Sequence, residues 1–200
     1  MLRAFSARPS RRLALGTLCR ATPLLRHRSR GMAAAVSPEE RMMENLYWWG
    51  VPTLFRCDHD VDPASCDIGL VGVPHSSGNG TTERDQHLGP RAVRNVSATA
   101  RRVHMEFGFD PWIDTRINDL GDVPLPELND NEASIQRITD YYKRLDDAGT
   151  RPVSIGGDHS ITGGIVQALG GGKLAGGEPI SFLHIDAVST GYLTASPHHL

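Results

Sequence analysis

The sequence predicts an α/β fold in which helices cover a parallel sheet. Short apolar runs rich in β-branched residues have the length of buried strands, and they lie at Asp67–Pro74, Ile117–Val123, Val153–Ile155 and Ile180–Leu183. Stretches with helical spacing of apolar residues separate these runs, so strands and helices alternate along the chain. This alternation is typical of parallel strands joined by crossover helices.

The first half of this pattern contains a strand and a helix. The run at Asp67–Pro74 is apolar throughout, which suits a strand buried on both faces. A helix is predicted from Gly89 to about Met105, because Pro90 is tolerated in a first helical turn. The short strand at Ile117–Val123 follows.

The longest predicted helix has a signal at each end. Asn129 or Asp130 supplies an N-cap, and Gly149 supplies a C-terminal stop. Apolar residues recur at helical spacing between them, at Ile135, Ile138, Tyr142, Leu145 and Ala148. Two shorter helices are expected, one from Ser37 through Tyr47 and one over Ile161–Leu169.

Composition indicates one ordinary globular domain. The chain has 200 residues, of which 39% are hydrophobic and 22% charged, and its formal net charge is -2. These values give no argument for a nucleic-acid or membrane partner. Three cysteines without a CxxC pair argue against a disulfide framework or a zinc knuckle.

The first 31 residues have a composition of their own. Met1–Gly31 contains eight arginines and no Asp or Glu. Such a leader resembles an organelle transit peptide, which predicts a mitochondrial location, with plastid or cytoplasmic location as alternatives. A basic tail that binds anions without specificity is the other interpretation. Residues 32–66 are then an N-terminal extension of the domain that starts at Asp67.

Candidate metal ligands lie at the carboxyl ends of the third and fourth predicted strands. Gly156-Gly157-Asp158-His159-Ser160 follows one strand, and His184-Ile185-Asp186-Ala187 ends the other. Open α/β sheets bind ligands at this edge, and an imidazole with a carboxylate suits a first-row divalent metal. Alternatively, His159 caps a turn and Asp186 caps a helix. On spacing alone, the two interpretations have equal weight.

A glycine-bearing loop, His75–Arg84, follows the first strand at the same edge of the predicted sheet. This is the position of a substrate loop in such folds. The loop contains no GxGxxG fingerprint and the chain contains no GxxxxGK[ST] motif, so a nucleotide site has little support.

Several motifs together resemble the ureohydrolase (arginase/agmatinase) family. Gly156–Ser160, followed downstream by Asp186-Ala187, is similar to two of its signatures. Other segments match family segments in the same order, namely Gly72-Val73-Pro74, Gly89-Pro90-Arg91 and Asp119-Leu120-Gly121-Asp122. The segment from Tyr47 to Cys57 is more similar to the agmatinase-like branch than to arginase proper.

The resemblance implies a three-layer α-β-α fold and a pair of Mn²⁺ ions. Its members hydrolyse a guanidino compound to urea and an amine, and here agmatine (which would give putrescine, a polyamine) competes with 4-guanidinobutyrate. By position, His159 and Asp186 would be metal ligands, and no catalytic residue can be assigned. A homo-oligomer is expected for a full-length member.

The resemblance also suggests roles for three further residues, and it gives His184 no role as a metal ligand. Asp158 would orient the metal-binding turn from behind the ligands. Arg84 and His87 would contact the tail of the substrate, or else belong to a solvated loop. His184 is expected to be a packed or hydrogen-bonded core histidine.

The end of the chain departs from the family pattern. Where the family has Asp-Ala-His-x-Asp, with all three polar residues bound to metal, this chain has Asp186-Ala187-Val188-Ser189-Thr190. Only two of the expected ligands can therefore be placed. Residues 67–187 are predicted to be the N-terminal part of a ureohydrolase domain, and 188–200 a tail foreign to the family.

Two explanations of this tail stay open. Val-Ser is what an intron boundary, GTRAGT, encodes when it is read in frame, which favours a truncated gene model or a retained intron over a short paralogue. In either case the 200-residue chain is predicted to be inactive alone. The alternative function is that of an inactive assembly or regulatory partner of a full-length ureohydrolase.

Overall fold

The computed structural model describes residues 37, 43, 49–77, 85–127 and 129–186. The predicted leader, most of the helix predicted from Ser37 through Tyr47, Arg84 and the tail 188–200 lie outside these residues. The chain divides into two units, Met1–Ser37 and Pro38–Leu200, and the fold described below belongs to the second.

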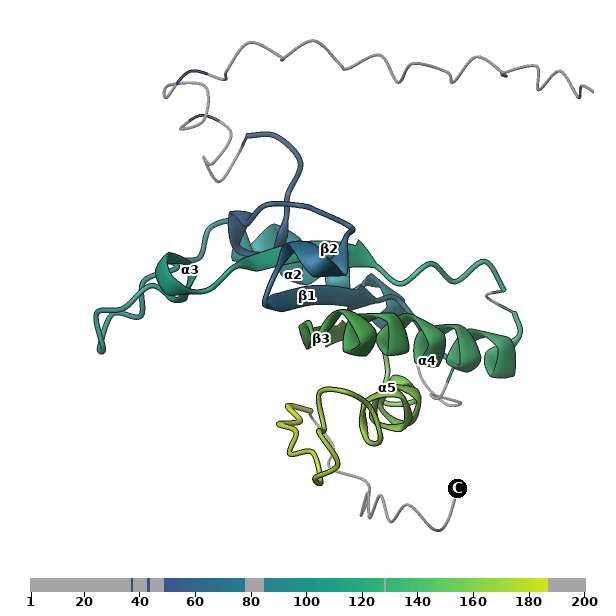
Figure 1. The fold of residues 1–200 in the computed structure, drawn as a ribbon. Coiled ribbons are helices and arrows are strands. Elements are labelled where there is room, and N and C mark those ends of the chain that lie inside the picture. Colours follow the sequence, from purple (N-terminus) through teal and green to yellow (C-terminus); the bar gives the residue numbers. More distant parts are fainter. Residues whose placement is uncertain (1–36, 38–42, 44–48, 78–84, 128, 187–200) are drawn as a thin grey trace, which may run out of the picture. The chain divides into compact units, whose positions relative to one another are not determined.

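Three strands and four α-helices follow one another in the described part of the chain (Figure 1). Their order is β1 (Ile68–Val73), α2 (Gly89–Ser97), α3 (Pro111–Asp114), β2 (Ile117–Asp122), α4 (Asn131–Ala148), β3 (Arg151–Gly156) and α5 (Ile161–Leu169). Short 3-10 turns lie at η1 (Leu54–Arg56), η2 (Pro63–Ser65) and η3 (Gln86–Leu88). Among the described residues, no helix is both long and apolar enough to cross a membrane.

The three strands form a parallel sheet with β1 in the middle, in the order β2-β1-β3. Ile68 of β1 lies opposite Ile117 of β2 on one side and Arg151 of β3 on the other. Because the strands are parallel, their carboxyl ends meet at one edge of the sheet. The loop after β1 and the turn after β3 start from that edge.

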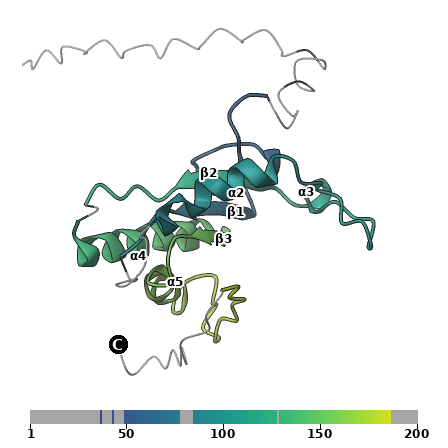
Figure 2. The same ribbon diagram turned by 180° about the vertical axis from the view of Figure 1, so that it is seen from behind.

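Side chains of β1 alternate between two cores, one on each face of the sheet. Val71 and Val73 pack with buried residues of α4 and α5. Leu70 packs instead with Leu54 and Ile117. On that second face α2 comes so close that a Cβ on Gly72 would lie 2.9 Å from the Cβ of Pro90. Figures 1 and 2 show α2 on one side of the sheet and α4 on the other, which confirms the predicted three-layer α-β-α arrangement.

Helix α4 has the ends and the apolar stripe that the sequence predicts. The Asp130 carboxylate accepts a hydrogen bond from the Ala133 N–H at 3.0 Å, and Gly149 ends the helix with φ 79°. Three residues of the stripe are fully buried: Ile138, Tyr142 and Leu145. Helix α5 packs against α4 where Gly164 lies, since a Cβ there would be 3.0 Å from the Thr139 Oγ1.

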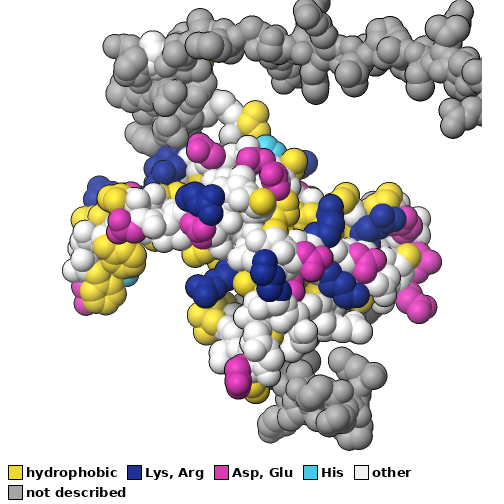
Figure 3. Space-filling model, viewed as in Figure 1, with side chains coloured by type: hydrophobic (Ala, Val, Ile, Leu, Met, Phe, Trp, Pro, Cys, Tyr) yellow, Lys and Arg dark blue, Asp and Glu magenta, His cyan; other side chains and the backbone are white. Residues whose placement is uncertain are grey.

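The helix predicted to reach Met105 ends earlier, at Ser97. The Ser97 and Thr99 hydroxyls donate to the carbonyl oxygens of Arg94 and Val96, and hydroxyl groups in such positions favour turns over further helix. The apolar side chains beyond this point are exposed, namely Val103, Met105, Phe107 and Phe109. Hydrophobic side chains gather at the left of Figure 3, on the side where α3 lies in Figure 1.

The strand predicted at Ile180–Leu183 is wrong. Residues 179–186 have no regular secondary structure, and Leu183 and Ile185 are 86% and 89% exposed. A parallel strand needs a neighbour for its backbone hydrogen bonds, and within the described residues the sheet ends at β3. The apolar content of this segment therefore does not make it a strand here.

Candidate metal centre

The turn after β3 is held against the end of β1. Gly157 has φ 42°, and a Cβ on it would lie 2.5 Å from the His75 carbonyl oxygen and 2.6 Å from that of Val73. Only glycine fits so close an approach in this backbone conformation. The Asp158 N–H donates to the His75 carbonyl oxygen at 2.9 Å. The position of the next residue, His159, is thus fixed by the central strand of the sheet.

Asp158 closes the same turn with its side chain. Its Oδ1 accepts hydrogen bonds from the Ser160 N–H, at 3.0 Å, and from the Ser160 hydroxyl. Both contacts lie just before the first residue of α5, so they fix the step from turn to helix. The role predicted for Asp158, behind a metal ligand, stays a prediction.

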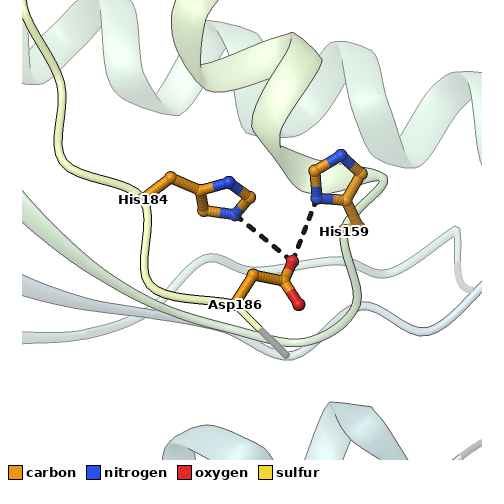
Figure 4. Close-up of side chains that lie close together, drawn as sticks. All are labelled: His159, His184 and Asp186. Atoms are coloured by element: carbon orange, nitrogen blue, oxygen red, sulfur yellow. Dashed lines mark hydrogen bonds and ion pairs between the residues drawn. The ribbon is translucent and has the colours of Figure 1, made fainter. Parts of the chain in front are cut away.

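Three side chains converge beyond this turn (Figure 4). The Nδ1 of His159 lies 3.1 Å from the Oδ2 of Asp186, and the Nε2 of His184 lies 3.3 Å from the same oxygen. The two imidazole rings are 5.0 Å apart, centre to centre. Each side chain is partly open to solvent, with 40% of His159, 32% of His184 and 27% of Asp186 exposed.

The distance from Asp186 to each histidine nitrogen fits one divalent metal ion. Ligand bonds of ~2.1 Å place neighbouring ligand atoms about 3.0 Å apart at right angles and about 3.4 Å apart at tetrahedral angles. The two nitrogen–oxygen distances fall in this range, and all three ligand atoms lie within 4.8 Å of one another. Two imidazoles and a carboxylate suit a transition metal. In the described part of the chain this is the one such group of three or more residues.

The interpretation of His184 as a core histidine is wrong. Its segment is not part of the sheet, so its side chain faces solvent and Asp186 rather than a core. The sequence contained a signal for this arrangement. Side chains two residues apart on an extended segment point to the same side, which applies to His184 and Asp186.

The two residues predicted to contact the substrate have different outcomes. Arg84 lies outside the described residues, and His87 lies exposed in η3, just before α2. The start of α2 lies against the end of β3, since a Cβ on Gly89 would be 2.4 Å from the Gly156 carbonyl oxygen. The segment that ends in η3 is therefore at the same edge of the sheet as the turn with His159. A contact between His87 and the substrate stays a prediction.

Sequence reasoning missed a buried histidine that joins these elements. His75 follows β1 and is 2% exposed. Its Nε2 lies 3.0 Å from the Asn131 Oδ1 at the start of α4 and 2.8 Å from the Ser77 Oγ. Together with its carbonyl contact to Asp158, this residue connects the loop after β1, helix α4 and the turn that carries His159.

A second acidic motif, Asp119-Leu120-Gly121-Asp122, forms a structural ion pair. Arg94 of α2 donates from Nε and Nη2 to the Asp119 carboxylate, at 2.8 and 2.9 Å, and from Nη1 to Asp122 at 2.6 Å. The backbone N–H groups of Leu54 and Gly121 also donate to Asp119, at 2.9 Å each. Burial acts to raise the pKa of Asp119, but these hydrogen bonds and the Arg94 charge hold it below its ordinary value.

Comparison with known proteins gives the family of the chain. Residues 66–188 match the family model described as "Arginase family". The guanidinopropionase of Pseudomonas aeruginosa is 39% identical over 140 residues, which are 70% of this chain and 42% of that protein. The mitochondrial guanidino acid hydrolase of Homo sapiens is 33% identical over 138 residues, 69% of this chain and 38% of that protein.

Solved structures give the same result. The proclavaminate amidino hydrolase from Streptomyces clavuligerus has a TM-score of 0.57 at 27% identity, over 61% of this chain and 40% of that one. A hypothetical agmatinase from Burkholderia thailandensis has a TM-score of 0.56 at 28% identity, over 61% of this chain and 38% of that one.

The chain spans about two fifths of the length of these curated relatives. The matches confirm the predicted resemblance to ureohydrolases of the agmatinase-like branch. The chain belongs to the arginase family.

Proposed function

We propose that this chain carries part of the site of a metal-dependent hydrolase that releases urea from a guanidino compound. The observation that carries the proposal is the convergence of His159 and Asp186, 3.1 Å apart, in a chain of the arginase family. These are the two residues that the family pattern assigns as metal ligands.

The side chains of this site would have two roles, namely to bind the metal and to hold the turn that carries the metal ligand. A bound divalent metal would supply a nucleophilic water at neutral pH and polarise the group under attack. His159 and Asp186 would hold the metal, and Asp158 and His75 would keep the turn in place through the hydrogen bonds described above. The described residues supply ligand atoms for one ion, so a pair of Mn²⁺ ions and full activity require further ligands.

For the substrate we propose a guanidino acid rather than agmatine. Three of the similar proteins are named guanidinopropionase, guanidino acid hydrolase and guanidinobutyrase, while a relative from Gallus gallus, at 31% identity, is named agmatinase. The segment Arg84–Leu88 places basic side chains before α2. A cationic side chain there would bind the carboxylate of a guanidino acid and repel the ammonium of agmatine.

A chimera tests both parts of this proposal. Residues 66–186 of this chain replace the matching segment of the P. aeruginosa guanidinopropionase, which supplies everything downstream of Asp186. With Mn²⁺, the chimera should release urea from guanidinopropionate or 4-guanidinobutyrate at least about tenfold faster than from agmatine, because a hydrogen bond to a charged group contributes ~1.5–3 kcal/mol. His159→Ala should abolish the release.

His104→Ala is the matched control, since this histidine is also exposed but stacks on Phe107, in the segment between α2 and α3. A folded chimera that binds Mn²⁺ and releases no urea would contradict the proposal. The 200-residue chain alone should release no urea from any of these compounds. Release by the chain alone would show that its site is already complete.

One observation favours a second function, that of an assembly partner. The outer edge of β3 is not paired within the described residues, and Val153 is 49% exposed on it. Such an edge can pair with another chain, either a second copy or a full-length relative. Co-expression with a tagged full-length homologue tests this. Separate elution of the two chains would argue against it.

We propose a mitochondrial location from the Arg-rich leader together with two relatives whose names include "mitochondrial". A fluorescent protein fused after residues 1–40 should be imported into mitochondria. Diffuse cytosolic fluorescence would contradict this location.

A further inference from the structure

We propose that His184 is a third metal ligand and that this chain binds one borderline transition-metal ion, such as Zn²⁺, in place of a Mn²⁺ pair. The inference rests on the proposed function for the place of the metal site. It goes beyond the proposed function by naming the ligands, the number of ions and the kind of ion.

The ligand set follows from the contacts of Asp186. One of its carboxylate oxygens faces both the Nδ1 of His159 and the Nε2 of His184, at 3.1 and 3.3 Å. One metal ion can replace both contacts with only small shifts, because cis ligands of an ion have about this separation (~3.0–3.4 Å). Both rings turn a nitrogen toward the same oxygen (Figure 4).

The sequence after Asp186 explains why His184 would take this role. Two and four residues further on, where the family pattern has His and Asp, this chain has Val188 and Thr190. Valine cannot bind a metal, and a neutral hydroxyl is a weak ligand. Two residues before Asp186, His184 supplies an imidazole on the same side of the extended segment.

The number of ions follows from charge. The group contains one carboxylate and two imidazoles, which bind metals only in their neutral form, so two divalent ions would leave most of their four positive charges unbalanced. Ions ~3.5–4 Å apart, as in two-metal sites, repel each other strongly without bridging carboxylates. One ion, with water in its remaining positions, is the arrangement that this group can stabilise. The partial exposure of all three side chains leaves room for that water.

The choice of ion follows from ligand type. Imidazole suits Zn²⁺, Ni²⁺ and Cu²⁺, while Mn²⁺ favours oxygen-rich sites and stands lowest in the Irving–Williams order. A group with two nitrogen ligands and one oxygen ligand therefore favours Zn²⁺ over Mn²⁺. Within the family pattern, by contrast, a further Asp adds an oxygen ligand, which makes the site more suitable for Mn²⁺.

The experiment measures metal binding by the full 200-residue chain. His198→Ala and His199→Ala form the background, because two adjacent histidines in the tail can bind metal by themselves. Zn²⁺ affinity is measured by competition with a chromophoric chelator, stoichiometry by equilibrium dialysis, and coordination by the visible absorption of bound Co²⁺. One Zn²⁺ per chain is expected, bound more tightly than Mn²⁺.

Three variants then test the ligands. His159→Ala, His184→Ala and Asp186→Asn should each weaken Zn²⁺ binding by more than about 100-fold, since even the loss of groups behind the ligands costs ~10–100-fold. His104→Ala should leave the affinity unchanged. Unchanged affinity in His184→Ala, with loss in the other two variants, would overturn the inference and leave the proposed function in place.

Two further outcomes would also overturn the inference: a stoichiometry of two ions per chain, or a preference for Mn²⁺. The chimera described above keeps the two proposals separate, because it carries the full ligand set of its parent downstream of Asp186. Its urea release tests the proposed function and should not depend on His184.

Discussion

Two aspartates, Asp119 in β2 and Asp186 near the turn after β3, differ in burial and in the partners of their carboxylates. Asp119 is 1% exposed and receives hydrogen bonds from Arg94, Leu54 and Gly121. Asp186 is 27% exposed and lies between two imidazoles. The first carboxylate has a permanent cation as its partner, while the second has two imidazoles, a side chain that commonly binds metals. This difference separates a residue that stabilises the fold from a residue that can bind an ion.

The largest effect is expected from breaking the buried cluster. Asp119→Ala leaves the Arg94 guanidinium, only 13% exposed, without its main partner. The free energy of unfolding should fall by ~3–5 kcal/mol, as for other buried ion pairs that lose one member. Urea denaturation followed by circular dichroism measures this. Asp122→Ala is the matched control, because that carboxylate is 43% exposed and should cost at most ~1 kcal/mol.

Alkylation of Cys57 is a second readout for the same variant. Burial, together with the charge of Asp119, raises the pKa of the Cys57 thiol to about 12, so the native chain should react slowly at pH 8. Faster reaction of Cys57 in Asp119→Ala is expected for two reasons: the loss of the Asp119 charge lowers the pKa of the thiol, and the buried cluster opens more often. Equal rates in both proteins would show that Asp119 does not hold this region closed.

The next largest effect concerns the exposed cluster and requires metal. Zn²⁺ at a hundredfold excess over its dissociation constant should stabilise the chain by ~2.7 kcal/mol, provided that the unfolded chain does not bind it. A chelator should remove this gain completely. Differential scanning fluorimetry in the background without the tail histidines measures both. A gain that persists in Asp186→Asn would show that the ion binds elsewhere.

A third comparison uses pH. The folded chain holds the pKa of Asp119 below its ordinary value, so its contribution to stability is present above that ordinary pKa and is lost as pH falls through the lower, folded value. Stability should therefore fall on acidification below about pH 4. In Asp119→Asn this part of the fall should be absent. Parallel pH profiles for the two proteins would contradict the assignment.

The smallest effect sharpens the contrast between the clusters. Without metal, Asp186→Asn should change the free energy of unfolding by less than ~0.5 kcal/mol, because exposed polar contacts contribute little. The same denaturation experiment, with chelator present, measures it. A loss as large as that of Asp119→Ala would mean that Asp186 is a structural residue.

Local signals allowed prediction of the central elements. Strand β1 is defined by its own apolar run, and helix α4 by the residues at its two ends, Asp130 and Gly149. Both elements were therefore predicted nearly to the residue. The predicted closeness of His159 and Asp186 followed from the rule that ligands gather at the carboxyl edge of a parallel sheet.

The features that were missed depended on contacts with distant parts of the chain, which a local sequence pattern does not reveal. The Ile180–Leu183 run was predicted as a strand, but strand formation requires a neighbouring strand. The same error led to the prediction that His184 is buried. Its side chain faces solvent because its segment lies outside the sheet. The end of α2 depended on hydroxyl contacts of Ser97 and Thr99, and the role of His75 depended on Asn131, far along the chain.

The hydrogen bond from the Asp158 N–H to the His75 carbonyl oxygen ties one half of the candidate site to the sheet, while the other half belongs to a segment outside the sheet. The turn that carries His159 is hydrogen-bonded to His75, just after the central strand β1. Asp186 belongs to a segment without regular structure, 27 residues further along the chain. An ion held by both would link the turn to this segment in the folded chain, and would restrict the motion of residues 179–186 there. Hydrogen exchange should then show metal-dependent protection of residues 179–186 and little change at the amide of Asp158.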